Sequence, residues 1–210
     1  MRRWVTFDCY GTLIDWNAGI GAELARIFPD ADADAMLARY HELEPLVQAG
    51  EPALSYREVM ARVLDRLGAA VVERDALARS LPHWPVFPDA PGALEALRDA
   101  GWGLCILSNS DRDLIEASIA RIGVPFDRSI VASEIGSYEP AHGHWRAFEQ
   151  EVGRPPDVHV AASLFHDVAP CAELGIPCIW INRTSERANG IRPARELPEA
   201  EDVTFEKDVE

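Results

Sequence analysis

Four polar stretches of this sequence follow short apolar runs, and each holds side chains that could do chemistry. The first is Asp8, after the β-prone run at residues 4–7; the others are residues 108–110, 137–140 and 166–167. A carboxylate at the tip of a buried strand can serve as a nucleophile or as a general acid or base. Each stretch alone could also simply cap a helix. The four stretches indicate a functional site only if the fold brings them together.

From residue 85 onward, the sequence alternates between strand and helix patterns. Buried strands are predicted at WGLCILS, RSIVAS, VHVAAS and PCIWINR, and amphipathic helices between them at DRDLIEASIARIG, GHWRAFEQEVG and VAPCAELG. Such alternation is typical of a parallel sheet with helices on both faces. Because the carboxyl ends of parallel strands lie at one edge, the four polar stretches are expected to face one crevice.

Residues 15–84 show helix patterns alone. Apolar residues recur at three- and four-residue spacing in NAGIGAELARIF, DADAMLARYHELEPLVQAG, SYREVMARVLDRLG and ERDALARSL. Ser55 and Glu58 predict a capping box at the start of the third helix. We therefore predict a three-layer α/β fold: a Rossmann-like parallel core of residues 1–14 and 85–210, with a helical cap at 15–84 that roofs the crevice. Residues 203–205 suit either an edge strand or an irregular end.

The composition restricts the partners. The 210 residues carry a formal net charge of −15, which argues against nucleic acid and anionic membranes, although a small anionic substrate remains compatible with it. No apolar run reaches the length of a membrane span. The four cysteines are scattered, without metal-ligand spacing. We expect a cytoplasmic protein with reduced thiols.

Several motifs resemble the haloacid dehalogenase superfamily, specifically its L-2-haloacid dehalogenase (type II) branch. They are FDCYGTLIDW, LSNSD, YEP and FHD followed by ELGIPCIWINR. The resemblance implies a cofactor-free hydrolase in which Asp8 attacks C2 of a 2-haloacid and forms an ester that water then cleaves. It also implies that Thr12 orients Asp8 and that Asp167 positions or activates the water. Members of the family often form homodimers, so a second copy is an expected partner beside the small-molecule substrate.

The resemblance implies substrate contacts as well. Ser108 and Asn109 would hold the substrate carboxylate and the side of the leaving group. Arg39, in LARYHELE, is the candidate for binding the halide, and Trp145 stands where the family tends to have a tyrosine near the substrate. Tyr10 replaces the second aspartate of the phosphatases, and a phenol is a poor general acid for that role. A phosphatase, with magnesium, is therefore the disfavoured alternative.

Glu139, in SYEP, reverses the charge of the lysine that the family has at this position. Three interpretations stay open. Glu139 turns away while His142, His144 or His166 supplies positive charge; or it faces a metal or a cationic part of the substrate, such as the amine leaving group of azetidine-2-carboxylate; or the protein is a non-catalytic small-molecule binder. His166 is a second departure, at a position that is usually aromatic, where an imidazole could fill space or shuttle a proton.

Overall fold

The computed structural model describes residues 1–51, 54–188, 190–200 and 203. Its strands are β1 (Trp4–Phe7), β2 (Gly103–Ser108), β3 (Arg128–Val131), β4 (Val158–Ala161), β5 (Cys178–Ile181) and β6 (Arg195–Leu197). Its α-helices are α1 (Trp16–Ile27), α2 (Ala33–Gly50), α3 (Tyr56–Leu67), α4 (Ala76–Ser80), α5 (Ala90–Asp99), α6 (Arg112–Ile122), α7 (Ala132–Ile135), α8 (Gly143–Val152) and α9 (Ala169–Leu174). Short 3₁₀ turns occupy η1 (Val71–Glu73) and η2 (Leu81–His83), and a π-helical turn occupies η3 (Leu164–Val168).

The described strands form one parallel sheet in the order β3-β2-β1-β4-β5-β6. β1 lies inside the sheet, with Val5 opposite Leu104 of β2 on one side and Val158 of β4 on the other. The four strands predicted after residue 85 are confirmed, whereas the short β6 was not predicted. Of the suggested strand at 203–205, residues 204–205 lie outside the described part of the chain.

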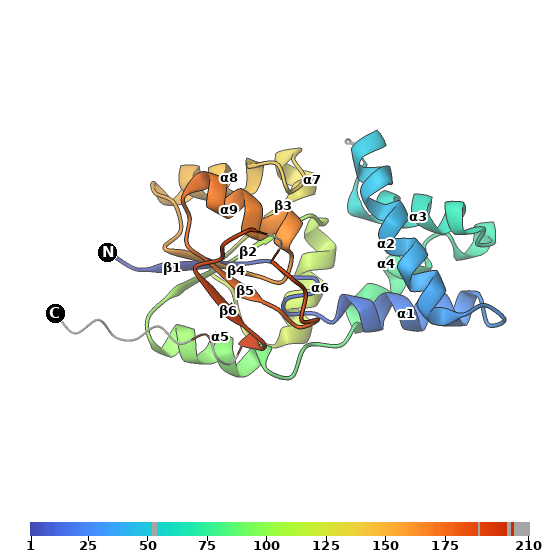
Figure 1. Cartoon of the computed structure of the whole chain (residues 1–210), viewed down its shortest axis with the longest axis horizontal. Coiled ribbons are helices and arrows are strands. Elements are labelled where there is room, and N and C mark those ends of the chain that lie inside the picture. The colour runs from blue at the N-terminus through green and yellow to red at the C-terminus, as the bar shows by residue number, and fades with distance from the viewer. Residues whose placement is uncertain (52–53, 189, 201–202, 204–210) are drawn as a thin grey trace.

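Side chains of the sheet alternate between two separate apolar cores, which produces three layers. In β2, Leu104 and Ile106 join a large core with residues of α5 and α6. Cys105 and Leu107 join a second core on the opposite face, with residues of α8 and α9. Figure 1 shows α5 on one side of the sheet and α8 and α9 on the other. The predicted α/β fold class is confirmed, because strands buried on both faces require helices on both sides.

Helices α1–α4 form a separate group beside the sheet, at the right of Figure 1. The large core continues into this group, where Ile20, Leu24 and Val59 are fully buried. The predicted capping box is present at the start of α3: the Ser55 hydroxyl accepts from the Glu58 N–H, and the Glu58 carboxylate accepts from the Ser55 N–H. Within the described residues, no helix combines the length and the apolarity needed to cross a membrane.

Two connecting segments join the cap to the sheet, and they are bonded to each other. Ile14, on the way out, forms an antiparallel bridge with Val86, on the way back. The N–H of Asp15 donates to the Pro85 carbonyl at 2.7 Å, and the N–H of Phe87 donates to the Leu13 carbonyl at 3.0 Å. The outgoing segment continues directly from the loop that carries Asp8, so the cap is attached at the carboxyl edge of the sheet.

Candidate active site

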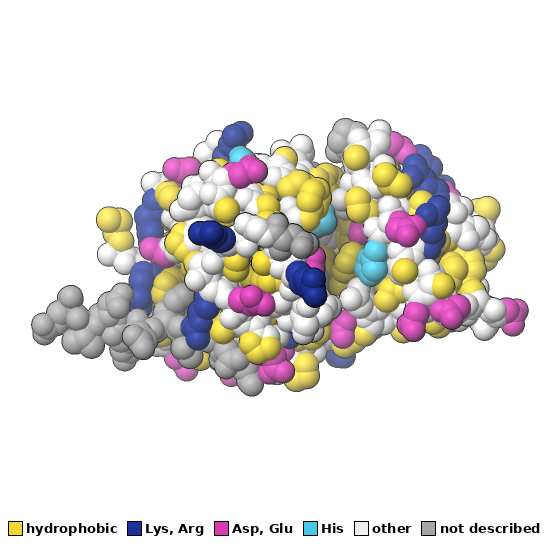
Figure 2. Space-filling model, viewed as in Figure 1, with side chains coloured by type: hydrophobic (Ala, Val, Ile, Leu, Met, Phe, Trp, Pro, Cys, Tyr) yellow, Lys and Arg dark blue, Asp and Glu magenta, His cyan; other side chains and the backbone are white. Residues whose placement is uncertain are grey.

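A cavity of about 290 Å³ lies where the carboxyl edge of the sheet meets the cap. All four polar stretches that follow the predicted strands contribute to it, as expected for one edge of a parallel sheet. The lining residues are Asp8, Tyr10, Ser108, Asn109, Glu139, Ser163, His166 and Asp167 from the core, and Trp16, His41, Glu44, Pro45, Gln48 and Tyr56 from the cap. Figure 2 shows histidine side chains on both sides of the boundary between the two parts.

Asp8 stands at the tip of β1, at the floor of this cavity. Its N–H donates to the Val160 carbonyl at 3.1 Å, which continues the pairing with β4. The Thr12 hydroxyl donates to Asp8 Oδ2 at 2.6 Å and accepts from the Ala162 N–H at 2.9 Å. Gly11, between them, has φ +94°, a conformation that favours glycine in this tight turn. The loop therefore fixes the carboxylate of Asp8 by its own backbone and by Thr12.

Two effects act on the charge of Asp8. Burial raises its pKa from 3.8 to about 8, and the neighbouring Asp167 adds to this, while the hydrogen bond from Thr12 opposes it. A carboxyl group with this pKa is half protonated near pH 8 and mostly protonated at neutral pH. A hydrogen-bond donor or a cation brought by a ligand would favour the ionised, nucleophilic form.

Asp167 lies in η3, just after β4, and is buried beside Asp8. Its Oδ1 lies 3.0 Å from Nε2 of His159, and Nδ1 of His159 lies 2.8 Å from the Thr6 hydroxyl. Burial raises the pKa of Asp167 to about 8 and lowers that of His159 to about 4, so the imidazole is neutral and orients the carboxyl group. His159 was not among the predicted site residues, although a lone histidine in the buried run VHVA was a usable signal.

Ser108 and Asn109 follow β2 and reach the cavity in different ways. The Ser108 hydroxyl is buried, lines the cavity and has no hydrogen-bond partner among the described residues. The Asn109 side chain bonds the backbone of Glu139 twice: Nδ2 donates to the carbonyl at 3.1 Å, and Oδ1 accepts from the N–H at 2.6 Å. Ser108 is therefore available to a ligand oxygen, while Asn109 also holds the Glu139 loop in place.

Glu139 does not turn away from the site. It is 3% exposed, lines the cavity, and its Oε1 has no hydrogen-bond partner in the described structure. Burial raises its pKa well above the usual range, and Asp167 and Asp8 raise it further. Of the three histidines expected to supply positive charge, His144 lies beside it, with Nδ1 3.7 Å from Oε1. Burial lowers the pKa of His144 to about 4, which disfavours a charged imidazole beside Glu139.

Aromatic rings from the cap and from the Asp8 loop surround a fourth buried acid, Glu44. Tyr10 stacks on Tyr56 with ring centroids 6.1 Å apart, and its hydroxyl lies 3.0 Å from the Ser118 hydroxyl. Glu44 is 7% exposed, and burial raises its pKa to about 7. Glu44 was not among the predicted site residues, although it occupies the face of α2 that is otherwise apolar. Among the described residues that line the cavity, none is lysine or arginine.

Arg39 is placed differently from its prediction. The buried positions of α2 are Tyr40, Leu43, Glu44 and Val47, a helical stripe that leaves residue 39 on the outer face. The Arg39 guanidinium is exposed and pairs with Glu42 at 2.6 Å. It is absent from the cavity lining, so the expected contact with the substrate is not formed in this structure.

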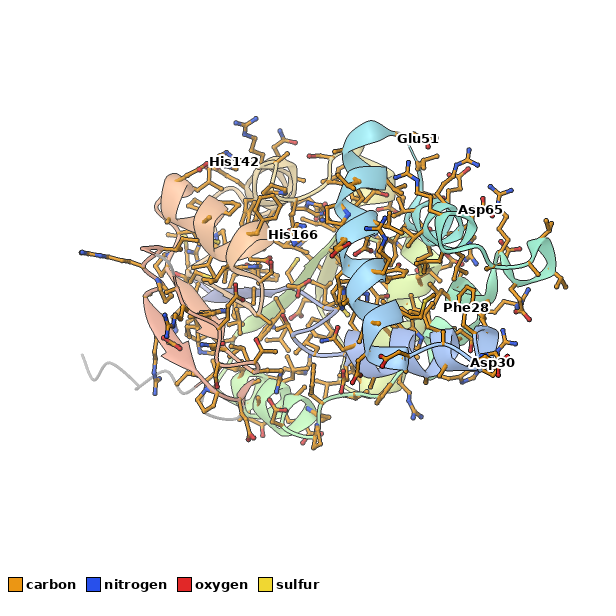
Figure 3. The ribbon with its side chains drawn as sticks, turned by 45° about the vertical axis from the view of Figure 1, so that its right-hand side comes forward. Phe28, Asp30, Glu51, Asp65, His142 and His166 are labelled. Atoms are coloured by element: carbon orange, nitrogen blue, oxygen red, sulfur yellow. The ribbon has the colours of Figure 1, made fainter. Side chains whose placement is uncertain are left out.

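Two other predicted contacts lie outside the cavity lining. Trp145 is buried in the second core, where it packs edge-on against His159 at a centroid distance of 5.5 Å. His142 lies at the start of α8 and pairs with Glu173, at 3.0 Å. His166 does line the cavity, and its Nδ1 lies 3.1 Å from the Ser163 hydroxyl. In Figure 3, His166 lies on the side of the sheet domain that faces α2, whereas His142 lies farther from it.

The parallel sheet, the inserted cap and the aspartate at the tip of β1 define a capped Rossmann-like hydrolase. A family model described as haloacid dehalogenase-like hydrolase matches residues 3–162, and the chain belongs to this family. The resemblance noted from the motifs is therefore confirmed. Among the described residues, no group of three or more His, Cys, Asp or Glu side chains has the arrangement of a metal site.

Individual relatives agree with this assignment. The (S)-2-haloacid dehalogenase 4A of Burkholderia cepacia is 25% identical over 196 residues, covering 86% of this chain and 83% of the relative. The haloacetate dehalogenase H-2 of Moraxella sp. is 28% identical, with 85% of each chain covered. The structure of L-2-haloacid dehalogenase from Xanthobacter autotrophicus with covalently bound chloropropionic acid matches with a TM-score of 0.81 at 21% identity, over 96% of each chain. This last likeness shows the shared fold.

Proposed function

We propose that this protein is a hydrolase that displaces a substituent at C2 of a small 2-substituted carboxylic acid through an ester on Asp8. The observation that carries the proposal is the position of Asp8 in the cavity between the sheet and the cap, where Thr12 holds it and Asp167 lies beside it. A fixed carboxylate can attack a saturated carbon, which divides one difficult hydrolysis into two easier steps. The family and the names of the relatives support the same chemistry.

The surrounding residues have complementary roles in this proposal. The unpartnered Ser108 hydroxyl and the Asn109 amide bind the substrate carboxylate, and the aromatic roof around Tyr10 encloses the rest of the molecule. Thr12 keeps its hydrogen bond to Asp8 as charge leaves the nucleophile. Once the ester forms, the ionised form of Asp167, oriented by His159, accepts a proton from the water that attacks the Asp8 carbonyl. No metal is required in either step.

The first test is isotope labelling with L-2-chloropropionate as the probe. Over multiple turnovers in H₂¹⁸O, we expect ¹⁸O to enter the carboxyl group of Asp8, seen by mass spectrometry of its peptide, because water attacks the enzyme carbonyl. Protein treated with EDTA should incorporate the label at an unchanged rate, and Asp8→Asn should release no product. Product formation without label in Asp8 would contradict the ester route, and EDTA sensitivity would contradict the metal-free proposal.

A further inference from the structure

The carboxyl group of Glu139 lies at the reacting end of the cavity. Asn109 fixes its backbone with two hydrogen bonds, so the side chain stands beside Asp8 and Asp167. The side chain is 2% exposed, and Oε1 is buried without a hydrogen-bond partner in the described structure. An unpartnered buried polar atom in a ligand cavity indicates a group that acts when the ligand is present.

The groups that face Glu139 favour the protonated acid. Asp8 and Asp167 face it from the ends of β1 and β4, and the Cys171 thiol approaches from α9. From α8, Nε2 of His144 lies 3.0 Å from the Ser108 carbonyl and must donate to it, since a carbonyl can only accept. A neutral His144 therefore presents the lone pair of Nδ1 toward Oε1. Beside this lone pair and the two carboxyl groups, Glu139 is more stable as a protonated acid with an O–H than as a further negative charge.

We propose that the leaving atom of the substrate is a nitrogen or an oxygen bonded to C2, and that Glu139 supplies the proton with which this atom departs. The inference rests on the proposed function, because it names the class of substrate for the same site. A halide leaves as a stable anion and needs no proton. An amine or alkoxide is a poor leaving group unless it is protonated as the bond breaks. A strained ring that contains the nitrogen or oxygen would also lower the barrier.

An oxygen of Asp8 bonds to C2 while the bond from C2 to the leaving atom breaks, and that atom keeps the electron pair and takes the proton of Glu139. Water then attacks the ester carbonyl, which restores the Asp8 carboxylate and releases a 2-hydroxy acid. The proton lost by this water passes through Asp167 back to Glu139. A nitrogen that arrives protonated gives the same balance, with its proton shared with an ionised Glu139.

Three probes distinguish the leaving atoms: azetidine-2-carboxylate for nitrogen, oxirane-2-carboxylate for oxygen, and L-2-chloropropionate for halide. We expect wild-type protein to convert at least one ring substrate with a kcat/KM at least tenfold above that for chloropropionate. The products would be 4-amino-2-hydroxybutyrate and glycerate, identified by NMR. A preference for chloropropionate over both rings would overturn the inference without any variant being needed.

The test of Glu139 itself is Glu139→Gln, which keeps the shape but cannot give up a proton. We expect kcat on the ring substrate to fall about 10²- to 10⁴-fold, the usual worth of a general acid. Chloropropionate turnover should fall by a smaller factor than turnover of the ring substrate, because a halide leaves without a proton. The matched control is Glu149→Gln, the same change at an exposed position of α8, and it should leave both activities unchanged. Equal rates of Glu139→Gln and wild type on the ring substrate would overturn the inference.

One set of results would refute the inference alone, and another would refute the proposed function as well. Label in Asp8 with chloropropionate, but turnover of neither ring, refutes the leaving-atom inference alone. No label in Asp8 with any of the three probes refutes the proposed function and, with it, the inference. Thermal unfolding of Glu139→Gln, compared with Glu149→Gln, separates a loss of catalysis from a loss of folding.

Discussion

Replacing Asp8 with asparagine should stabilise the folded protein at high pH. In the folded chain the pKa of Asp8 is raised from 3.8 to about 8 by burial and by Asp167. Between these two values the folded state holds a proton that the unfolded chain has lost. The contribution of this group to the free energy of unfolding is therefore complete below pH 3.8 and is lost as the pH rises through 8. Asparagine is neutral throughout and has no such dependence.

The size of the effect follows from the shift. About four pKa units at 1.36 kcal/mol per unit set an upper limit of about 6 kcal/mol for the stability that wild type loses across this range. The Asp8 side chain is partly exposed to the cavity, and solvent screening reduces the penalty of its charge. We therefore expect the free energy of unfolding of Asp8→Asn to exceed that of wild type by about 2–4 kcal/mol at pH 8.5, and by about 1 kcal/mol or less at pH 4.5.

Urea unfolding followed by tryptophan fluorescence can measure this, since the chain has six tryptophans. The free energy of unfolding would be determined for both proteins at pH 4.5, 6, 7 and 8.5. Asp30→Asn, at an exposed turn of the cap (labelled in Figure 3), is the matched control and should parallel wild type. If the free energy of unfolding of Asp8→Asn changed with pH in the same way as that of wild type, the raised pKa of Asp8 in the folded protein would be refuted.

Three further predictions concern the cap and the nucleophile loop. Gly19→Ala should lower the free energy of unfolding by about 1–3 kcal/mol, because the added Cβ would lie 2.3 Å from the Trp84 ring. Gly21→Ala, in the same helix, is the control: its Cβ would lie 3.8 Å from the Leu37 side chain, so it should be neutral or stabilising in the same urea assay. Arg39→Ala should keep kcat/KM within about twofold of wild type in a chloride-release assay, since the side chain is exposed. A tenfold rise in KM would instead support the substrate contact that the sequence predicted for Arg39. Thr12→Val should raise the pKa of the nucleophile, because the hydroxyl donates to it. The rising limb of the pH–kcat/KM profile should therefore move to higher pH, and an unmoved limb would contradict the hydrogen bond.

The strands and the position of the nucleophile could be predicted because both depend on local sequence. Apolar runs of strand length, separated by helical periodicity, specify the layers, and the motif around Asp8 specifies a strand tip. β6 could not be found in this way, because it is three residues long and its first two residues are exposed. Its pairing with β5 is a tertiary contact that no local pattern contains.

The site was predicted less completely, and the reason lies in the cap. Residues of the core loops are fixed by strand ends, so Ser108 and Asp167 reach the cavity as expected. On a helix, a difference of one position turns a side chain by about 100°. A motif match in α2 therefore selected Arg39, on the outer face, when the helical stripe places Glu44 inside. His159 does not line the cavity itself but contacts Asp167, and it belongs to no loop motif. Only its burial marks it as a residue of the site.

The central place of β1 has a consequence for how the chain folds. Its sheet partners begin at Gly103 and Val158, so this strand is synthesised long before either neighbour exists. The cap helices, whose contacts with one another are local, can form during that interval. Until β2 and β4 emerge, Val5 and Phe7 remain exposed on an unpaired strand, which is the kind of segment that aggregates or recruits chaperones. The strand that leads to Asp8 is thus the first of the sheet to be synthesised, yet one of its edges stays unpaired until β4 has been made.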